Sequence, residues 1–523
     1  MSVSEDGLYA QDKVMELSQV PAYPRSVDSF ENIICHIGVG GFHRSHEAMY
    51  INQLLLQADA NGNTDPTGRW AIVGIGLMPW DNRMREALEA QDCCYTLVTR
   101  SPAGSKAQVI GSIVDFVYAP EDRKACVERL ASPQCKIVSL TVTEKGYCLN
   151  VDNELDVNNA LVAHDLATPD EPQSAVGLIV AALKLRRERG VPAFTVLSCD
   201  NLPGNGHLSQ LMTMAYLKAL GDADLQAWVE ANGKFVNTMV DRITPITKPE
   251  HIDLVKVDYG VDDKWPVIAE DYAQWVVEDQ FVNGIRPDLE SAGVLVVPDV
   301  HPYELMKLRL LNAGHSALSY VSYLCGHRFV DAAMKDPKVT SYLMGVFAEH
   351  TSTLSPVPGV DIPDYIATLI ARFSNPYIKD TVQRLAEDGS MKLVTTMRDP
   401  AVENLKAGNS TDMFSFTVAT WIRYLVGTDE NGDVIEIKDP AGADAGLLTM
   451  AKEICHAGEP GSTGPGNVSA PTDKALLAQF VTKVFGTEAG SSDQIVDGIF
   501  AVLVDICTMG TAARLQSYMD SKA

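Results

Sequence analysis

The first half of the chain alternates short apolar runs with longer amphipathic stretches. Four of the runs are rich in β-branched residues and lack polar alternation, which is typical of strands buried on both faces of a parallel sheet. They are NIICHIGVG (32–40), WAIVGIG (70–76), KIVSLTVT (136–143) and AFTVLSCD (193–200). The stretch AVGLIVAALKLRRE (175–188) has helical periodicity. Strands and helices in this rhythm predict a Rossmann-type, doubly wound α/β domain.

From about residue 208 the pattern becomes mostly helical. One strand-like run, AGVLVVPDV (292–300), interrupts it and could return to the first sheet, and the Gly/Pro/Ser-rich piece 457–472 predicts a surface loop. We therefore expect a nucleotide-binding α/β domain at 1–228 and a mostly α-helical substrate and catalytic domain at 229–523. Further helices are predicted at 302–326, 329–350, 362–373, 376–388, 411–426, 474–485 and 493–519.

Composition and charge narrow the partners. The 523 residues are 46% hydrophobic and 21% charged, as in an ordinary globular protein, and no apolar run is long enough to span a bilayer. A net charge of -26 argues against nucleic acid or an anionic membrane as a partner, because both need a basic surface. The ten cysteines form no C-x-x-C pair and no zinc-spaced cluster, so we expect reduced thiols, no metal and a cytoplasmic protein.

The first predicted strand runs into a glycine-rich turn, GVGGFHRSHEAMY (38–50). Gly38 and Gly40 supply the tight turn and the close backbone approach that a pyrophosphate needs at a helix N-terminus. His43 stands where the usual fingerprint has its third glycine, and a simple strand–helix turn remains the alternative. The position after the first strand of an α/β domain favours dinucleotide binding. The candidate cofactor-binding residues are Ile37, Gly38, Val39, Gly40, Gly41, Phe42, His43 and Arg44, with His43, Arg44 and His46 as added donors.

An acidic residue near the end of the second strand would bind the adenosine ribose and disfavour a 2′-phosphate. Asp81 follows the strand at 70–76, so NAD is favoured over NADP. Arg83 and Arg85 lie close in sequence and could serve a phosphate instead.

The stretch Lys307 to Tyr320, KLRLLNAGHSALSY, carries polar residues in an apolar helix. At about 100° per residue with Lys307 at zero, Glu304 falls at about 60°, His315 at about 80° and Asn312 at about 140°. These side chains therefore share one arc, and a solvent-facing polar stripe is the alternative interpretation.

The chain resembles the long-chain polyol-specific dehydrogenases, also called the mannitol dehydrogenase family. The family signature K-x-x-x-x-N-x-x-H is matched by Lys307, Asn312 and His315. Other motifs that carry the resemblance are HIGVGGFHRSHEAMY, WAIVGIGLMPWD, TVTEKGY (141–147), SCDNLPGNG (198–206), VDRITP (240–245) and RFSNPYIKDTVQR (372–384).

The resemblance implies metal-independent hydride transfer between NAD and a small polyol or keto-sugar, with Lys307 as general base. Burial among leucines would lower the pKa of such a lysine. Asn312 and Asn201 would donate hydrogen bonds to the reacting oxygen, and His315 would orient the substrate. The resemblance also implies that Glu304 relays protons near Asp241, that Arg384 contacts the polyol, and that Thr143 and Glu144 line the nicotinamide pocket.

Structural roles remain open for some of these groups. Asn201 could cap a helix, Asp241 could pair with Arg242, Arg384 could be a solvated helix residue, and TEKGY could be a simple turn. The segment after Lys392, LVTTMRDPAVENLKAG, departs from the family pattern, which puts substrate preference in doubt.

We expect an enzyme that interconverts D-mannitol and D-fructose, as a monomer or a homodimer. A related dehydrogenase for D-arabinitol, a reductase for fructuronate or tagaturonate, and a catalytically silent NAD-binding regulatory protein are the alternatives.

Overall fold

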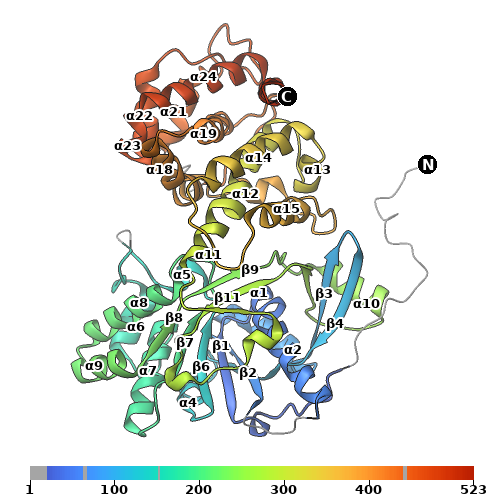
Figure 1. The fold of residues 1–523 in the computed structure, drawn as a ribbon. Helices are drawn as coiled ribbons and strands as arrows, with labels where there is room; N and C mark the ends of the chain where they lie inside the picture. Colours follow the sequence, from blue (N-terminus) through green and yellow to red (C-terminus); the bar gives the residue numbers. More distant parts are fainter. Residues whose placement is uncertain (1–19, 63–67, 151–152, 440–444, 523) are drawn as a thin grey trace. The chain divides into compact units, whose positions relative to one another are not determined.

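The computed structural model describes residues 20–62, 68–150, 153–439 and 445–522. The chain forms two compact units, one ending at His301 and the other beginning at Pro302. Unit 1 contains the sheets and unit 2 is helical (Figure 1). The prediction of an α/β domain followed by a mostly helical one is therefore confirmed.

Unit 1 is built on a six-stranded sheet whose paired strands are all parallel. The strand order β5-β2-β1-β6-β7-β8 is that of a doubly wound dinucleotide-binding fold, in which the direction of winding reverses between β1 and β6. Ligands of such folds bind at the carboxyl ends of the strands near this switch point. The strands are β1 (Asn32–Ile37), β2 (Trp70–Gly76), β5 (Ile113–Tyr118), β6 (Cys135–Leu140), β7 (Thr195–Ser198) and β8 (Lys234–Val236).

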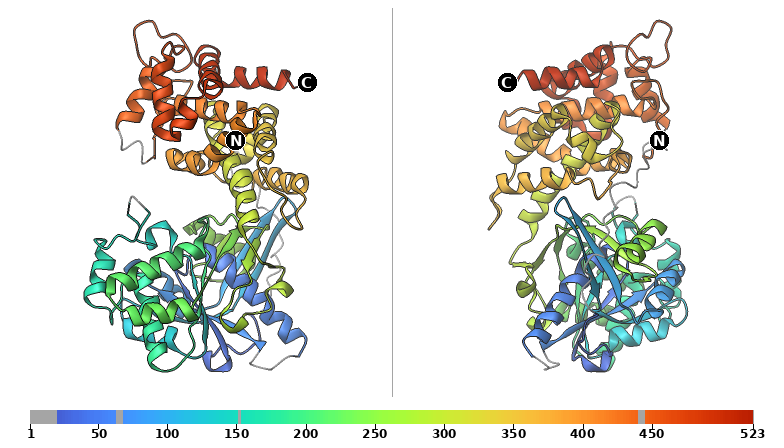
Figure 2. Two further views of the ribbon diagram at one scale, coloured as in Figure 1. Left: turned by 60° about the vertical axis from the view of Figure 1, so that its left-hand side comes forward. Right: turned by 90° about the vertical axis from the view of Figure 1, so that its right-hand side faces the viewer.

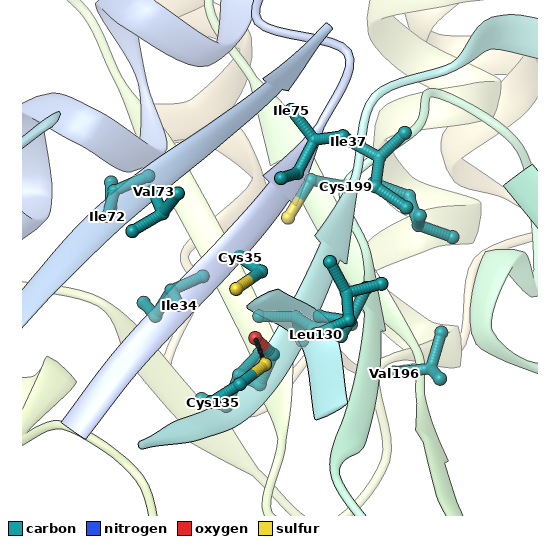
Figure 3. Packing of buried hydrophobic residues seen from close by; sticks show 14 of the residues in the cluster. Ile34, Cys35, Ile37, Ile72, Val73, Ile75, Leu130, Cys135, Val196 and Cys199 are labelled. Carbon is teal, nitrogen blue, oxygen red and sulfur yellow. Dashed lines mark hydrogen bonds between the residues drawn. The ribbon is translucent and has the colours of Figure 1, made fainter. Parts of the chain in front are cut away.

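Strand burial explains the sequence pattern. Every residue of β1, β2 and β7 is buried, so these strands show no polar alternation. Three cysteines lie among the aliphatic side chains of this core, Cys35 on β1, Cys135 on β6 and Cys199 just after β7 (Figure 3). Burial raises the pKa of the Cys199 thiol, which keeps it protonated. All ten cysteines are free thiols.

Helices surround the sheet of unit 1. Among them, α7 occupies the predicted range and is capped by Ser174, whose hydroxyl accepts from the Gly177 N–H. The helices of unit 1 are α1 (Gly41–Ser45), α2 (Glu47–Ala60), α3 (Asn82–Glu89), α4 (Arg123–Ala131), α5 (Thr143–Gly146), α6 (Ala160–Ala167), α7 (Ala175–Glu188), α8 (Asn205–Leu220), α9 (Ala223–Asn232) and α10 (Pro249–Tyr259).

Two three-stranded sheets extend unit 1 beyond the predicted boundary at 228/229. Their orders are β10-β3-β4 and β12-β11-β9, and the β3–β4 hairpin is visible in Figure 2. The helical interpretation of 234–241 was wrong, because β8 and β9 occupy these residues. The run at 292–300 does return to unit 1 as β12, but in a small sheet. These strands are β3 (Tyr95–Ser101), β4 (Gly104–Ile110), β9 (Thr238–Asp241), β10 (Val267–Glu270), β11 (Gln274–Glu278) and β12 (Leu295–Val297).

Unit 2 is a helical bundle that contains two π-helical segments. Three predicted helices are broken or shorter than expected: 329–350 is divided into α13 and α14, 376–388 keeps only α16, and 493–519 breaks at Gly510, which has φ +87°. The helices are α11 (His301–Met306), η7 (π, Lys307–Asn312), α12 (Ala313–Leu324), α13 (Val330–Met334), α14 (Pro337–Thr351), α15 (Ile362–Phe373), α16 (Val382–Ala386), α17 (Gly389–Leu393), η8 (π, Val394–Arg398), α18 (Asp399–Ala407), α19 (Asp412–Leu425), α21 (Ala445–Ile454), α22 (Lys474–Phe485), α23 (Thr487–Gly490), α24 (Asp493–Met509) and α25 (Thr511–Asp520).

Candidate active site

The glycine-rich turn joins β1 to α1 at the switch point of the sheet. Gly38 has φ +95°, and a Cβ on it would lie 2.3 Å from the Thr141 carbonyl oxygen. The Thr141 hydroxyl donates to the Gly38 carbonyl at 2.7 Å, which ties the turn to the end of β6. A Cβ on Gly40 would meet only the Gly38 carbonyl oxygen, at 3.8 Å. The turn is therefore closed on the side of β6 and open at Gly40, as a backbone cradle for a phosphate requires.

His43 replaces the third glycine by stacking on the strand beneath it. Its ring lies 3.4 Å from that of His36 on β1, at an interplanar angle of 16°. One carboxylate oxygen of Glu47 lies 2.9 Å from His36 Nδ1 and 3.1 Å from His43 Nδ1, and it accepts from the Ser139 hydroxyl at 3.0 Å. In the usual fingerprint a glycine lets the helix approach the strand. Here a pair of stacked imidazoles fills the crossing.

The Glu47 carboxylate carries a negative charge in this cluster. Burial alone would raise the pKa of Glu47, but hydrogen bonds from the two imidazoles outweigh it and hold the pKa below its usual range. Burial, followed by the neighbouring His36, lowers the pKa of His43 to about 3, so His43 is neutral.

His36, His43 and Glu47 are also the group among the described residues whose ligand atoms lie close enough together to hold a metal ion. Both Nδ1 atoms already lie at hydrogen-bond distance from one oxygen of Glu47, which also accepts from the Ser139 hydroxyl. The arrangement therefore suits hydrogen bonding better than chelation.

Two other basic residues of the turn make structural contacts. Arg44 is fully buried, donates to the Trp265 carbonyl and lies 5.1 Å from the centre of the Tyr95 ring. His46 Nε2 lies 2.9 Å from the Gln274 carbonyl oxygen, and burial lowers the pKa of His46 to about 4. The predicted contact of Arg44, His43 and His46 with phosphates gains no support from these positions and stays a prediction.

The end of β2 presents Asp81 on a braced turn. A carboxylate oxygen of Asp81 accepts from the Met78 N–H at 2.8 Å, and burial raises the pKa of this carboxyl. Of the two arginines that could have served a 2′-phosphate, Arg85 pairs with Glu121, and the guanidinium of Arg83 lies 3.7 Å from the centre of the Trp265 ring.

The ends of β6 and β7 are joined by Asp200. Its carboxylate accepts from the Thr143 N–H at 2.7 Å, the Val142 N–H at 3.2 Å and the Tyr147 hydroxyl at 2.9 Å. These bonds hold Thr143 at φ +63°, a rare conformation for a β-branched residue. Such strain is concentrated at functional sites.

The other predicted residues of unit 1 lie at or near strand ends. Asn201, which follows Asp200, and Glu144 are exposed. Asp241 is the buried last residue of β9, paired in register with Gln274. The neighbouring Arg242 donates to the backbone carbonyls of Ser45 and Glu270.

In unit 2, the lysine helix is interrupted by the π segment η7. The angles predicted from the sequence at about 100° per residue are therefore wrong inside Lys307–Asn312. There the i→i+5 bonding turns the chain by only roughly 80° per residue. With this change Asn312 moves to about 40° from Lys307 and His315 to about -20°, while Glu304 stays at about 60°. The four polar side chains thus share a narrower arc than the sequence predicted. Lys307 itself is only 7% exposed.

A buried histidine supports the π segment. His350 on α14 places Nδ1 2.7 Å from the Arg309 carbonyl oxygen, and burial lowers its pKa to about 4, so the neutral ring donates. Arg309 also forms a bidentate ion pair with Glu403, in which both N–O distances are 2.7 Å. A side chain that bonds a helix carbonyl in this way is a recognised cause of a local break in α-helical bonding.

The remaining predicted residues of unit 2 lie around the same helix. His315 stacks on Phe373 with ring centres 4.4 Å apart. Arg384 belongs to α16, which packs against α12, and it is held by Asp380. Lys392, close to Arg384, is a further cation whose pKa is lowered by burial. The segment after Lys392 forms η8 and α18, and the two π segments pack against each other.

Comparison with known proteins agrees with this arrangement. The profile for the mannitol dehydrogenase Rossmann domain matches residues 32–291, and that for the mannitol dehydrogenase C-terminal domain matches residues 299–453. A relative from Saccharomyces cerevisiae, mannitol dehydrogenase 2, is 42% identical over 424 residues, which are 80% of this chain and 82% of the relative.

The chain belongs to the mannitol dehydrogenase family.

Two solved structures of similar proteins cover nearly the whole fold. A Pseudomonas fluorescens mannitol 2-dehydrogenase, solved as a ternary complex with NAD and D-mannitol, is 37% identical with a TM-score of 0.79 and 97% of each chain covered. A D-sorbitol dehydrogenase in substrate-free form is 34% identical with a TM-score of 0.83, covering 95% of this chain and 97% of that one. The resemblance inferred from the signature motifs is confirmed.

The sequence did not predict the roles of several residues of this mannitol dehydrogenase family member. Asp200 stands beside Asn201 in the motif SCDN, but the motif gave no sign that Asp200 accepts hydrogen bonds from the turn after β6. His36 and Glu47 gave no signal, because a polar residue in a buried strand or helix shows its partners only in three dimensions. His350 lies 43 residues from Lys307 in sequence and could not be linked to it. Among the described residues, no helix combines the length and hydropathy needed to cross a membrane.

Proposed function

We propose that this chain is an NAD-dependent dehydrogenase that interconverts D-mannitol and D-fructose with Lys307 as general acid and base. The observation that carries the proposal is the Lys307, Asn312 and His315 set, which the π segment η7 brings onto one narrow arc of a buried helix. The family membership and the similarity to an NAD- and mannitol-bound enzyme support it.

The residues of unit 1 fit NAD. Gly38 and Gly40 form the phosphate cradle, and Asp81 stands where the adenosine ribose hydroxyls require an acceptor. NADP is disfavoured because Arg85 pairs with Glu121 and the Asp81 carboxylate would repel a 2′-phosphate. Bound NAD would supply the hydride acceptor, and Thr143 and Glu144 would line the nicotinamide pocket.

Lys307 removes the proton from the C2 hydroxyl of mannitol while the C2 hydride leaves for the cofactor. The products are fructose, NADH and one proton, which Lys307 passes on. A neutral lysine is needed for this step, and the buried position of Lys307 favours the uncharged form. Asn312 and Asn201 donate hydrogen bonds to the oxygen as its negative charge develops, each worth about 3 kcal/mol in comparable sites.

The remaining groups bind substrate and move protons. His315, held flat by Phe373, orients a substrate hydroxyl. Arg384, with its guanidinium fixed by Asp380, contacts the polyol chain. Glu304, in the turn before Lys307, relays the proton toward solvent, and Asp241 assists that route.

We also propose that the reaction needs no metal, since the lysine and the two amides supply base and oxyanion functions. The enzyme works in the cytoplasm, an assignment supported by its ten free thiols, and acts as a monomer or homodimer. Full activity after dialysis against a strong chelator is the expected result, and activity restored only by added zinc would contradict metal independence.

A substrate panel tests the function. Purified protein is assayed for NADH formation at 340 nm with D-mannitol, D-sorbitol and D-arabinitol, and for NADH consumption with D-fructose, fructuronate and tagaturonate. We expect the highest kcat/KM for mannitol and fructose, and a preference for NAD over NADP. D-Sorbitol is included because a D-sorbitol dehydrogenase has a closely similar fold. Turnover of none of these compounds would favour the silent NAD-binding alternative.

Lys307→Ala tests the mechanism. Loss of a positioned general base lowers kcat by about 10²–10⁴-fold, and NAD affinity should remain unchanged. The matched control is Lys335→Ala, which removes an exposed lysine of the same unit and should retain wild-type turnover. Wild-type kcat in Lys307→Ala across the pH range would exclude the lysine as the base.

A further inference from the structure

An exposed tryptophan stands beside the ribose-binding position. Trp80 is 71% exposed on the 3-10 turn Pro79–Asp81, directly before Asp81. The chain has six tryptophans, and Trp80 is the only one that is exposed; the others are buried or half-buried. An indole left in water is costly, since a tryptophan side chain carries a large apolar area. Isolated apolar side chains are common on protein surfaces, so it is the position of Trp80 beside Asp81, more than its exposure, that points to a ligand.

The turn that carries Trp80 is rigid. The Met78 N–H donates to the Asp81 carboxylate at 2.8 Å, the Asp81 N–H donates to the Met78 carbonyl at 2.9 Å, and the Tyr118 hydroxyl donates to the Pro79 carbonyl at 2.9 Å. The last bond ties the end of β2 to the end of β5. The indole is thus presented on a backbone that is ordered in advance, which lowers the entropic cost of binding.

Two glycines of β2 leave room for neighbouring side chains beneath the turn. A Cβ on Gly76 would lie 2.9 Å from the Phe116 ring and 3.1 Å from Asp81 Cβ, and a Cβ on Gly74 would lie 2.8 Å from the same ring. The absent side chains let Phe116 fill the floor and let Asp81 fold back against the strand end. The site therefore has an apolar floor, an acceptor and a flat aromatic face on one edge.

The topology indicates what this edge would bind. In a doubly wound sheet the turn after the first strand holds the pyrophosphate, and the acid after the second strand holds the adenosine ribose. The base attached to that ribose then extends from β1 toward β2 and β5, away from the switch point. This is the edge at which Trp80 stands, and adenine is a flat aromatic ring that stacks on indole.

We propose that Trp80 is the stacking platform for the adenine of the dinucleotide. The inference rests on the proposed use of NAD and adds a binding residue to it. Trp80 contributes affinity for the adenosine half of the cofactor and takes no part in the hydride transfer.

The test measures binding of ADP-ribose and of NAD by isothermal titration calorimetry, independently of turnover. Trp80→Ala should weaken both ligands by the same factor, about tenfold to a hundredfold, the range of one base–aromatic stack. Trp80→Phe should lose less, because it keeps an aromatic face. The control Trp228→Phe changes a half-buried tryptophan of α9 and should bind as the wild type does.

Fluorescence gives a second readout, which begins with the wild-type protein. In the wild type, saturating ADP-ribose should quench tryptophan emission and shield it from acrylamide, and both effects should disappear in Trp80→Phe. Circular dichroism confirms that each variant is folded.

Binding of ADP-ribose by Trp80→Ala within twofold of wild type would overturn the proposal. So would emission from Trp80 that responds to protein concentration but not to ADP-ribose, because that would make Trp80 a contact between copies of the chain. Wild-type protein that bound no ADP-ribose would overturn both this proposal and the use of NAD. Tight binding of ADP-ribose without oxidation of any polyol would overturn the proposed reaction and leave the role of Trp80 supported.

Discussion

Gly38 gives a quantitative test of the glycine-rich turn, through the substitution Gly38→Ala. At φ +95° an alanine is strained by about 1–2 kcal/mol. Its Cβ would also lie 2.3 Å from the Thr141 carbonyl oxygen, so the end of β6 must retreat by roughly 1 Å to restore ordinary contact.

That movement breaks further contacts. The Thr141 hydroxyl, which bonds the Gly38 carbonyl at 2.7 Å and lies 2.8 Å from His36 Nε2, would lose both partners. At about 1 kcal/mol for each bond, the total loss is about 3–4 kcal/mol. Hydrogen exchange of peptides from β1 and β6 measures it as a lower free energy of opening. NAD affinity, measured by calorimetry, should fall as well.

Gly40→Ala is the matched control. Gly40 has φ -96° and open space around its Cβ position, so alanine should leave the opening energy unchanged or raise it slightly. The added methyl group stands on the open side of the cradle, and NAD binding should weaken at least about tenfold. The reasoning is refuted if Gly38→Ala loses less than about 1 kcal/mol, or if Gly40→Ala binds NAD normally.

Two other predictions concern stability and the strained turn. His43 and His46 have pKa values lowered to about 3 and about 4, so between pH 6.5 and pH 5 only the unfolded state takes up protons on them. The free energy of unfolding should therefore fall as the pH is lowered, by about 2 kcal/mol for each histidine at pH 5. Urea unfolding of the full chain at pH 7.5 and pH 5 measures the change. A flat profile would contradict the burial of neutral imidazoles. Asp200→Asn should release Thr143 by removing a charged acceptor, which costs about 2–3 kcal/mol of local stability, seen as faster hydrogen exchange at 141–147 and a raised KM for NAD. The control Asp170→Asn, at an exposed position, should change neither the exchange rate nor the KM. An equal effect of both substitutions would contradict the specific role of Asp200.

The fold could be predicted where burial dominates the pattern. β2 and α7 occupy the ranges predicted for them, because a strand buried on both faces and a capped amphipathic helix have distinct signatures. β10 and β11 were missed, since each is only four or five residues long and depends on strands far away in sequence. The run at 234–241 shows the same limit, because short apolar segments have no clear period.

The candidate site was predictable in its residue types and less so in its geometry. The spacing of Lys307, Asn312 and His315 indicated one helix face, but the phase of that face depends on a π segment that His350 supports from another helix. The glycine pattern indicated the turn, while the role of His43 depends on its contact with His36 across the strand–helix crossing. Contacts between distant segments decide such details, and one sequence does not reveal them.

The π segment also changes how the lysine helix can evolve. A π turn is equivalent to one residue inserted into an α-helix, so deleting one residue between Lys307 and Asn312 would restore ordinary bonding. Four steps of about 100° would then turn the chain by about 400°, as five steps of about 80° do now, so Asn312 and His315 would keep their direction relative to Lys307. Loss of the His350 bond to the Arg309 carbonyl could instead restore α-helical bonding without a deletion, and both residues would then rotate by about 100° relative to the lysine. The arrangement of this helix should therefore tolerate a one-residue deletion better than the loss of the contacts that hold the π segment.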